Sequence, residues 1–345
     1  MTDAQVQPAP WIQRQLDTLL AQRGHAWLLQ GPSGLGQFEL ALSLAKAWLC
    51  ERPSAQGACG HCDSCHLVDT HAHPDFAVLM PETVMLDWQW PLPEKAQKEI
   101  DDKSRKPSKE IRVDAMRDAV AFAQRTSARG RGLVVLVYPA ERMNAVTANA
   151  LLKTLEEPAG DTRFVLATEA THQLLPTIRS RCQAHAMNWP SEAESLGWLQ
   201  QQVATQGQGV PDAERVRTWL QAAGGRPADA LLWARTGLTA QAWAGLPGAL
   251  SRGDWGGLAD WPAARQLDVL QKLCHDLMAR ASGAPTRYFP ADCLPGAPRL
   301  RALANWSREL MAAARSVEHP FSAGLMQEAW AARAQQVLRP RAGPA

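Results

Sequence analysis

The sequence contains no long apolar run. A membrane-spanning helix needs about 20 consecutive apolar residues, and no stretch approaches that length. The first ten residues, MTDAQVQPAP, also lack the basic and apolar regions of a secretory signal. We therefore expect a cytoplasmic protein without a membrane segment.

The sequence also lacks an excess of charge. Its 36 Lys and Arg residues are set against 34 Asp and Glu residues, which gives a net charge of +2. A protein that binds nucleic acid through bulk charge needs a larger basic excess. Any contact with DNA is therefore expected to be local or made through partners. With 345 residues, 46% of them hydrophobic, the chain can form two or three domains with cores of their own.

A phosphate loop is present, but its working side chains are missing. Residues 31–38 read GPSGLGQF, between a strand pattern at 25–29 and a helix pattern at 38–49. This matches the spacing G-x-x-x-x-G-K-[ST], in which lysine neutralises phosphate oxygens and the hydroxyl binds magnesium. The degenerate loop comprises Gly31, Gly34, Gly36, Gln37 and Phe38. We expect it to bind no ATP, or to bind ATP weakly; an ordinary strand-to-helix turn is the alternative.

A second element of ATP chemistry is missing further along the chain. The apolar run GLVVLV at 132–137 predicts a strand buried on both faces of a parallel sheet. In an ATPase of this type an Asp-Glu pair follows that strand, binds magnesium and orients the attacking water. Tyr138 and Pro139 stand there instead. The loss of both elements argues against a motor.

Four of the seven cysteines lie within sixteen positions of each other. They are Cys50, Cys59, Cys62 and Cys65. Two overlapping C-x-x-C steps let a short chain surround a tetrahedral ion, and four thiolates leave no open position for water. The spacing therefore predicts a structural Zn²⁺ site, with free thiols or a redox dithiol as alternatives. One of the nearby histidines could replace a cysteine ligand: His61, His66, His71 or His73.

The segment 81–109 has an unusual composition. It contains two tryptophans and the mixed-charge run EKAQKEIDDKSRKPSK. This composition predicts a solvated loop, prone to disorder, inserted in the domain. A DNA-contacting arm is the alternative, which the acids disfavour because they offset the bases.

The rest of the first domain alternates helices and strands. Patterns predict helices at 111–124 and from 145, the latter capped by Asn144 and ended by Pro158, and a strand at 164–168. The segment 174–182, LLPTIRSRC, is expected to close the domain.

Five motifs carry a resemblance to a known family. GPSGLGQF, the four cysteines, ANALLKTLEEP, FVLAT and RSRC, in this order, resemble δ′ subunits of the bacterial DNA polymerase III clamp loader, which are AAA+ proteins. The resemblance implies an α/β P-loop NTPase-like (AAA+) parallel-sheet domain with a zinc-binding insertion, a small helical lid and an all-α collar. The corresponding ranges are 1–189, with the zinc module at 50–66 and the inserted loop at 81–109, then 190–237 and 238–345.

The resemblance also implies a function. Such a subunit is a non-hydrolysing stator in a hetero-pentameric ring with γ/τ-type ATPase subunits and a δ subunit, which loads the sliding clamp on primed DNA. In the SRC motif (Ser180, Arg181, Cys182), Arg181 would reach into a neighbour's ATP site. Arg179 is a weaker candidate, Cys182 is assigned no chemistry, and a plain surface arginine is the alternative for Arg181. Two other functions remain open: an autonomous AAA+ ATPase of the γ/τ type, and a zinc-dependent nucleic-acid-binding module.

After Pro190 only helices are expected. Ser191 with Glu194 forms a capping box, Asp212 can start a helix that ends at Gly224-Gly225, and Arg226 is interpreted as structural. Further helices are predicted at 263–280, 299–317 and 325–338. The tryptophans of this region fall among Leu and Ala at helical spacing, so we expect packing rather than base stacking.

Overall fold

The computed structural model describes residues 8–205, 211–296, 298–314, 317 and 323–338. The chain divides into two units, Met1–Pro190 and Ser191–Ala345. The predicted first boundary lies next to this division, whereas the predicted separation of lid and collar at 237/238 stays a prediction. Among the described helices, none combines the length and the apolar character that crossing a bilayer requires.

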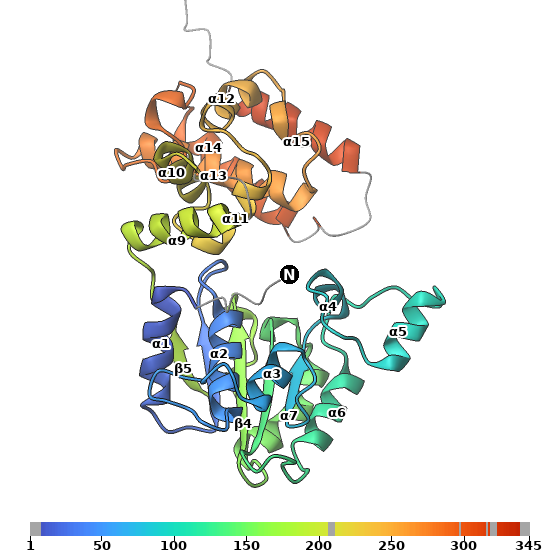
Figure 1. Ribbon diagram of the computed structural model, residues 1–345. Coiled ribbons are helices and arrows are strands. Elements are labelled where there is room, and N and C mark those ends of the chain that lie inside the picture. Colours follow the sequence, from blue (N-terminus) through green and yellow to red (C-terminus); the bar gives the residue numbers. More distant parts are fainter. Residues whose placement is uncertain (1–7, 206–210, 297, 315–316, 318–322, 339–345) are drawn as a thin grey trace, which may run out of the picture. The chain divides into compact units, whose positions relative to one another are not determined.

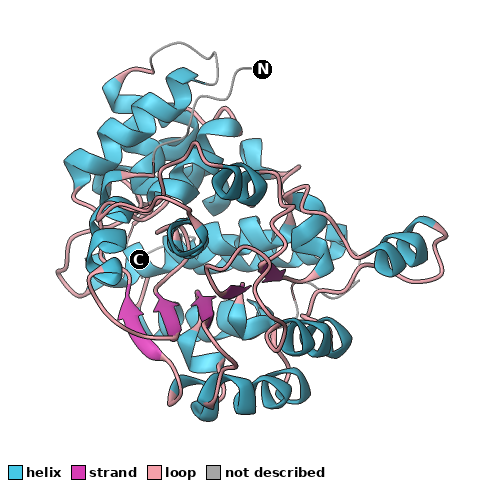
Figure 2. Ribbon diagram, turned by 60° about the horizontal axis from the view of Figure 1, so that its bottom comes forward, coloured by secondary structure: helices cyan, strands magenta, loops and turns pink. Residues whose placement is uncertain are grey.

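A parallel sheet with strand order β2-β3-β4-β1-β5 forms the centre of the first unit, and its strands lie side by side in Figure 2. The strands are β1 (Ala26–Gln30), β2 (Phe76–Leu79), β3 (Leu133–Val137), β4 (Thr162–Thr168) and β5 (Gln183–Ala186). In the register, Leu28 of β1 pairs with Leu166 of β4 and with Ala184 of β5. The predicted parallel α/β fold is confirmed.

Helices cover both faces of this sheet (Figure 1). The helical elements of the first unit are α1 (Pro10–Leu20), α2 (Gln37–Leu49), α3 (Asp63–Asp69), α4 (Glu82–Asp87), α5 (Glu94–Asp101), α6 (Val113–Phe122), η1 (Ala140–Arg142), α7 (Ala145–Glu156), η2 (Thr171–Gln173) and α8 (Pro176–Arg179). Successive strand residues point to opposite faces. Val135 and Val137 accordingly share a core with α6 and α7, while Val134 packs with Ala45 and Leu49 of α2.

The edge strand β5 was not predicted. We expected the segment 174–182 to close the domain, but α8 is followed by a strand with the sequence QAHA. An edge strand has only one neighbour and can remain largely exposed, so it needs no apolar run. His185 Nε2 lies 3.1 Å from Gln15 Oε1 of α1, a contact that ties this edge to the first helix.

The prediction of a loop prone to disorder at 81–109 is wrong. The segment contains α4 and α5, and α5 projects away from the sheet (Figure 1). Arg105 donates from Nη1 and Nη2 to the carboxylate of Glu82, at 2.5 and 2.7 Å, and from Nε to Glu99 at 2.7 Å. The Ser108 amide also donates to Glu82, at 2.8 Å. A carboxylate with three donors, only 8% exposed, holds the two ends of the insertion together.

The second unit is helical throughout its described residues. Its elements are α9 (Glu192–Thr205), α10 (Ala213–Ala222), α11 (Pro227–Arg235), α12 (Ala240–Ser251), η3 (Gly256–Leu258), α13 (Ala263–Ala281), η4 (Ala291–Cys293), α14 (Leu300–Ala314) and α15 (Ala323–Leu338). The predicted capping box is confirmed, since Ser191 N donates to Glu194 Oε2 and Glu194 N donates to Ser191 Oγ. Asp212 caps α10 through the Glu214 amide.

One apolar core runs through this second unit. The tryptophans of the region all belong to that core or pack against it: Trp198, Trp219, Trp233, Trp243, Trp255, Trp261, Trp306 and Trp330. Their predicted packing role is confirmed. Arg226 donates to the Ala223 carbonyl and pairs with Asp229 within its own helix region, which agrees with a structural role.

Candidate functional site

The phosphate loop connects β1 to α2 and is packed against α1. Gly36 has φ +93°, a left-handed conformation that favours glycine, and a Cβ there would lie 2.8 Å from Ile12 Cδ1 of α1, so that side chain would have to shift. Trp11 Nε1 of α1 donates to the Leu35 carbonyl at 2.9 Å. Contacts with α1 therefore hold the loop in this conformation.

The side chain in the lysine position of the loop is bound to the loop itself. Gln37 is 2% exposed, and its Nε2 donates to the carbonyls of Gly31 at 2.8 Å and Pro32 at 2.7 Å. A neutral amide that donates to these carbonyls brings no positive charge to a phosphate. The Gln37 side chain thus stabilises the loop as it is.

An aromatic cluster surrounds the residue in the Ser/Thr position of the phosphate loop. Phe38 stands in the Ser/Thr position, and its ring centroid lies 4.7 Å from Trp88 and 5.2 Å from Tyr138. Trp88 also stacks on Tyr138 at 5.5 Å, and Trp90 lies 5.9 Å from Phe38. We call Phe38, Trp88, Trp90 and Tyr138 the aromatic plug. Phe38 thus contributes an apolar ring where the phosphate-loop pattern has a hydroxyl that binds magnesium.

Tyr138 takes the place of the acidic pair after β3. Its hydroxyl donates to Glu169 Oε1 at 2.9 Å. Burial, together with the nearby Glu169 charge, raises the pKa of Tyr138 far above its ordinary value, so the phenol stays neutral. A neutral phenol that donates its proton to Glu169 is a poor ligand for magnesium, which favours carboxylates and phosphates.

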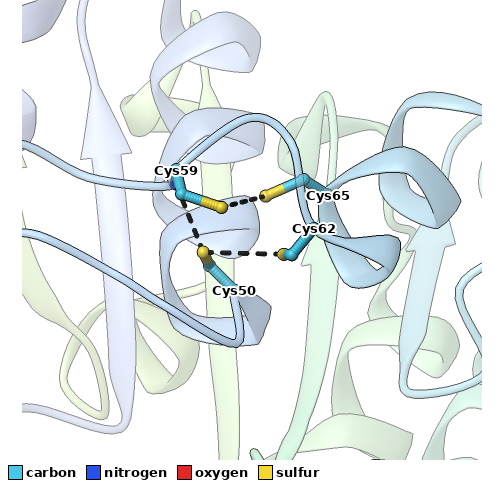
Figure 3. A group of neighbouring side chains, drawn as sticks. All are labelled: Cys50, Cys59, Cys62 and Cys65. Atoms are coloured by element: carbon cyan, nitrogen blue, oxygen red, sulfur yellow. Dashed lines mark hydrogen bonds between the residues drawn. The ribbon is translucent and has the colours of Figure 1, made fainter.

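The four clustered cysteines converge at the end of α2 (Figure 3). Their sulfur atoms all lie within 4.8 Å of one another, and the group that meets this limit among the described residues contains no histidine. Cys50 Sγ lies 3.8 Å from Cys62 Sγ, and Cys59 Sγ lies 4.0 Å from Cys65 Sγ. Zn–S bonds of about 2.3 Å place the sulfurs of a tetrahedral site about 3.8 Å apart, so the donor set fits such an ion.

Local structure explains how the chain brings these thiols together. Cys50 ends α2, Cys62 starts α3 and Cys65 lies in its first turn. The backbone amide of His61 is the main cause that lowers the pKa of Cys59 to about 6, whereas burial raises the pKa values of Cys50 and Cys65. Backbone donors thus favour the thiolate form of Cys59, which lies next to the buried thiols of Cys50 and Cys65. This combination is suited to binding a cation.

Arg129 joins this cysteine module to the sheet. Its Nε donates to Ser64 Oγ at 2.9 Å and its Nη2 to Glu51 Oε1 at 2.5 Å. The loop that carries Arg129 is held by Asp75, whose carboxylate accepts from the amides of Ala128 and Arg129. The sequence offered no signal for this network, because the partners are far apart along the chain.

The three residues of the SRC motif have separate roles in the structure. Ser180 Oγ donates to the Thr177 carbonyl at 3.1 Å. Cys182 packs against the core shared by β3, β4 and α7, and burial raises its pKa to about 12, so it is an inert anchor. Between them Arg181 is partly exposed, pairs with Glu156 at the end of α7 and donates from Nη1 to the Thr177 carbonyl at 2.9 Å. Arg179, the last residue of α8, is exposed.

These features define a class of protein. A parallel sheet, a β1–loop–α2 unit with the spacing of a phosphate loop and an arginine just after α8 describe an AAA+ module, in which Gln37 and Phe38 stand at the lysine and Ser/Thr positions of the loop. Residues 11–190, more than half of the chain, match the family described as "DNA polymerase III, delta subunit". The chain belongs to this family.

Two relatives matched by sequence agree with that assignment. The chain is 41% identical over 222 residues to DNA polymerase III subunit delta′ of Pseudomonas aeruginosa, covering 63% of this chain and 58% of that protein. It is 34% identical over 199 residues to subunit delta′ of Escherichia coli, covering 56% and 53%. The matches thus span little more than half of each relative. A solved structure of a DNA polymerase III γ subunit-related protein from Thermotoga maritima is similar at a TM-score of 0.44 and 17% identity, covering 94% of this chain and 99% of that one.

Proposed function

We propose that this chain is a non-hydrolysing subunit of the bacterial replicative clamp loader. It would act in the cytoplasm within a hetero-pentameric ring, beside γ/τ-type ATPase subunits and a δ subunit, and help to load the sliding clamp on primed DNA. Family membership and relatives named subunit delta′ support this role.

The single observation that carries the proposal is the state of the nucleotide position. The Gln37 amide is bound to the loop's own carbonyls, and Phe38, packed in the aromatic plug, has no hydroxyl to offer a magnesium ion. A triphosphate at this loop would lose both its lysine and its metal. The chain is therefore suited to be a rigid neighbour of an ATPase and not an ATPase itself.

The catalytic contribution we assign to this chain is Arg181, acting in trans. A guanidinium beside the γ-phosphate of a neighbouring subunit offsets the charge that develops during phosphoryl transfer, an effect of about 10³- to 10⁵-fold in related NTPases. Partial exposure of Arg181, with its backbone fixed by the partly buried neighbour Cys182, supports that use.

We assign a structural Zn²⁺ ion to Cys50, Cys59, Cys62 and Cys65. Four thiolates complete a tetrahedral shell, so the ion would link α2 to α3 and supply folding energy rather than catalysis. The sulfur separations support this assignment.

Arg181→Ala in a loader reconstituted with its cognate subunits tests the proposal. Only the ATP site that faces Arg181 should be affected. In a single turnover with clamp and primed DNA, each complex should therefore rapidly hydrolyse one ATP molecule fewer than the wild type. Arg179→Ala, two residues earlier at the end of α8, is the matched control and should hydrolyse as the wild type does. Normal hydrolysis by an assembled Arg181→Ala complex would exclude the assigned role.

A further inference from the structure

We propose that Glu156 is a positioning residue for Arg181. Glu156 is the last residue of α7, and its Oε1 accepts from Arg181 Nε at 2.6 Å and also contacts Nη2. The inference rests on the proposed role of Arg181 in a neighbour's ATP site. It adds a second residue of this chain to that site, one that acts through the arginine and not on the phosphate.

The donors of Arg181 show why this contact is compatible with phosphate binding. A guanidinium has five N–H donors. Contacts with Glu156 and the Thr177 carbonyl use one donor on each of the three nitrogens. Within the described part of the chain the two remaining donors, one on Nη1 and one on Nη2, have no acceptor. A pair of N–H groups on the two terminal nitrogens is the arrangement that binds phosphate oxygens bidentately.

The surroundings fix the arginine from two directions. The Thr177 carbonyl accepts from both Ser180 Oγ and Arg181 Nη1, and Cys182 anchors the next residue in the core. These contacts fix the backbone and one nitrogen of the side chain. Glu156, from a different helix, then fixes the rotation of the guanidinium plane.

A role in fold stability explains Glu156 poorly. An acidic side chain in the last turn opposes the helix dipole, which is negative at that end. The side chains of Arg181 and Glu156 are 28% and 49% exposed, and ion pairs at such exposure contribute little to stability. The Glu156 carboxylate is better explained by its contact with Arg181, which holds the guanidinium in place.

The expected effect of Glu156 is modest. A flexible arginine loses rotamer freedom when it binds the transition state, which costs free energy. An arginine that Glu156 already holds in one rotamer avoids this cost at that step. Removing the Glu156 charge should therefore slow hydrolysis at the neighbouring site about 2- to 10-fold, without changing the ATP concentration for half-maximal rate.

Single-turnover ATP hydrolysis in the complete loader, with clamp and primed DNA, tests this. Glu156→Gln should slow the phase that Arg181→Ala removes, and Glu156→Asp should recover part of the rate. Glu157→Gln, the adjacent exposed carboxylate without a side-chain contact in the described chain, is the matched control and should match the wild type. The double variant Glu156→Gln/Arg181→Ala should be no slower than Arg181→Ala alone, because Glu156 acts only through the arginine.

The outcomes separate the two proposals. If Arg181→Ala slows hydrolysis but Glu156→Gln equals the wild type or is faster, the positioning role is wrong and the arginine's role stands. If the double variant is slower than Arg181→Ala, Glu156 acts independently of the arginine, and the inference is again wrong. If Arg181→Ala itself has no effect, the proposed function fails and this inference fails with it.

Discussion

Phe38 of the phosphate loop and Trp88 of the inserted segment pack edge to face, with ring centroids 4.7 Å apart. Through this contact a segment that follows β2 covers the start of α2. The hydroxyl that would bind magnesium in an ATPase is replaced by a ring, and the ring is in turn covered by another. The residue that lacks the magnesium-binding hydroxyl of the pattern is thus also the one that packs against the inserted segment.

The first prediction concerns the stability of this contact. Trp88→Ala should lower the free energy of unfolding by about 1–3 kcal/mol, because it removes two aromatic contacts, with Phe38 and Tyr138. Leu86→Ala is the control: Leu86 is exposed to a similar fraction as Trp88, 40% against 43%, but its side chain is smaller and aliphatic, so the change should stay within about 0.5 kcal/mol. Urea unfolding measures both. Equal effects of the two variants would mean that the plug contributes no specific stability.

The second prediction concerns pH. Burial alone would raise the pKa of Glu82, but donors from Arg105 and the Ser108 amide outweigh it and hold that pKa below its ordinary value of 4.5. A carboxyl with a depressed folded-state pKa stabilises the fold above its unfolded-state pKa, and this contribution is lost as the pH falls through the folded-state value. Arg105→Met should therefore cost on the order of 1–3 kcal/mol at pH 7, and the difference from the wild type should shrink below pH 4.5.

Unfolding curves of the Arg105 variant at neutral and acid pH measure this. Arg117→Met is the control, because Arg117 is 70% exposed and lies 3.8 Å from an exposed Asp114. It should change stability little at either pH. A cost for Arg105→Met that is the same at both pH values would show that the ion pair is not its source.

The sequence predicted the elements whose signals are local. The strand, loop and helix from β1 to α2, the Asn144 cap of α7 and the four-cysteine spacing are each encoded within a few residues. Apolar runs such as GLVVLV identified strands buried on both faces, which supported a parallel sheet. The four metal ligands were predicted from the cysteine spacing alone, and these cysteines lie together in the structure.

The sequence failed where partners are distant or polar. The segment 81–109 has no apolar period and many charges, so its order depends on contacts of Trp88 with Phe38 and of Glu82 with Arg105, which composition does not reveal. The strand β5 is polar because it lies at an edge. The pairing of Arg181 with Glu156 joins two motifs that the sequence presents separately.

The third prediction concerns the metal. Protein purified without chelator should contain one zinc ion per chain, and Cys62→Ser should lower zinc retention and destabilise the first unit, because the shell loses a thiolate. Cys293→Ser, which changes a cysteine outside the cluster, should keep the zinc. Metal analysis and thermal unfolding test this. A chain free of zinc, or a Cys62→Ser variant with full zinc content, would contradict the assignment.

Nucleotide binding by the isolated chain is the most direct measurement of whether its own phosphate loop is inactive. A titration with a fluorescent ATP analogue and magnesium, followed by an assay for phosphate release, should show no saturable binding in the micromolar range and no turnover. Saturable micromolar binding accompanied by hydrolysis would contradict the account, because neither Gln37 nor the aromatic plug could then be excluding the nucleotide.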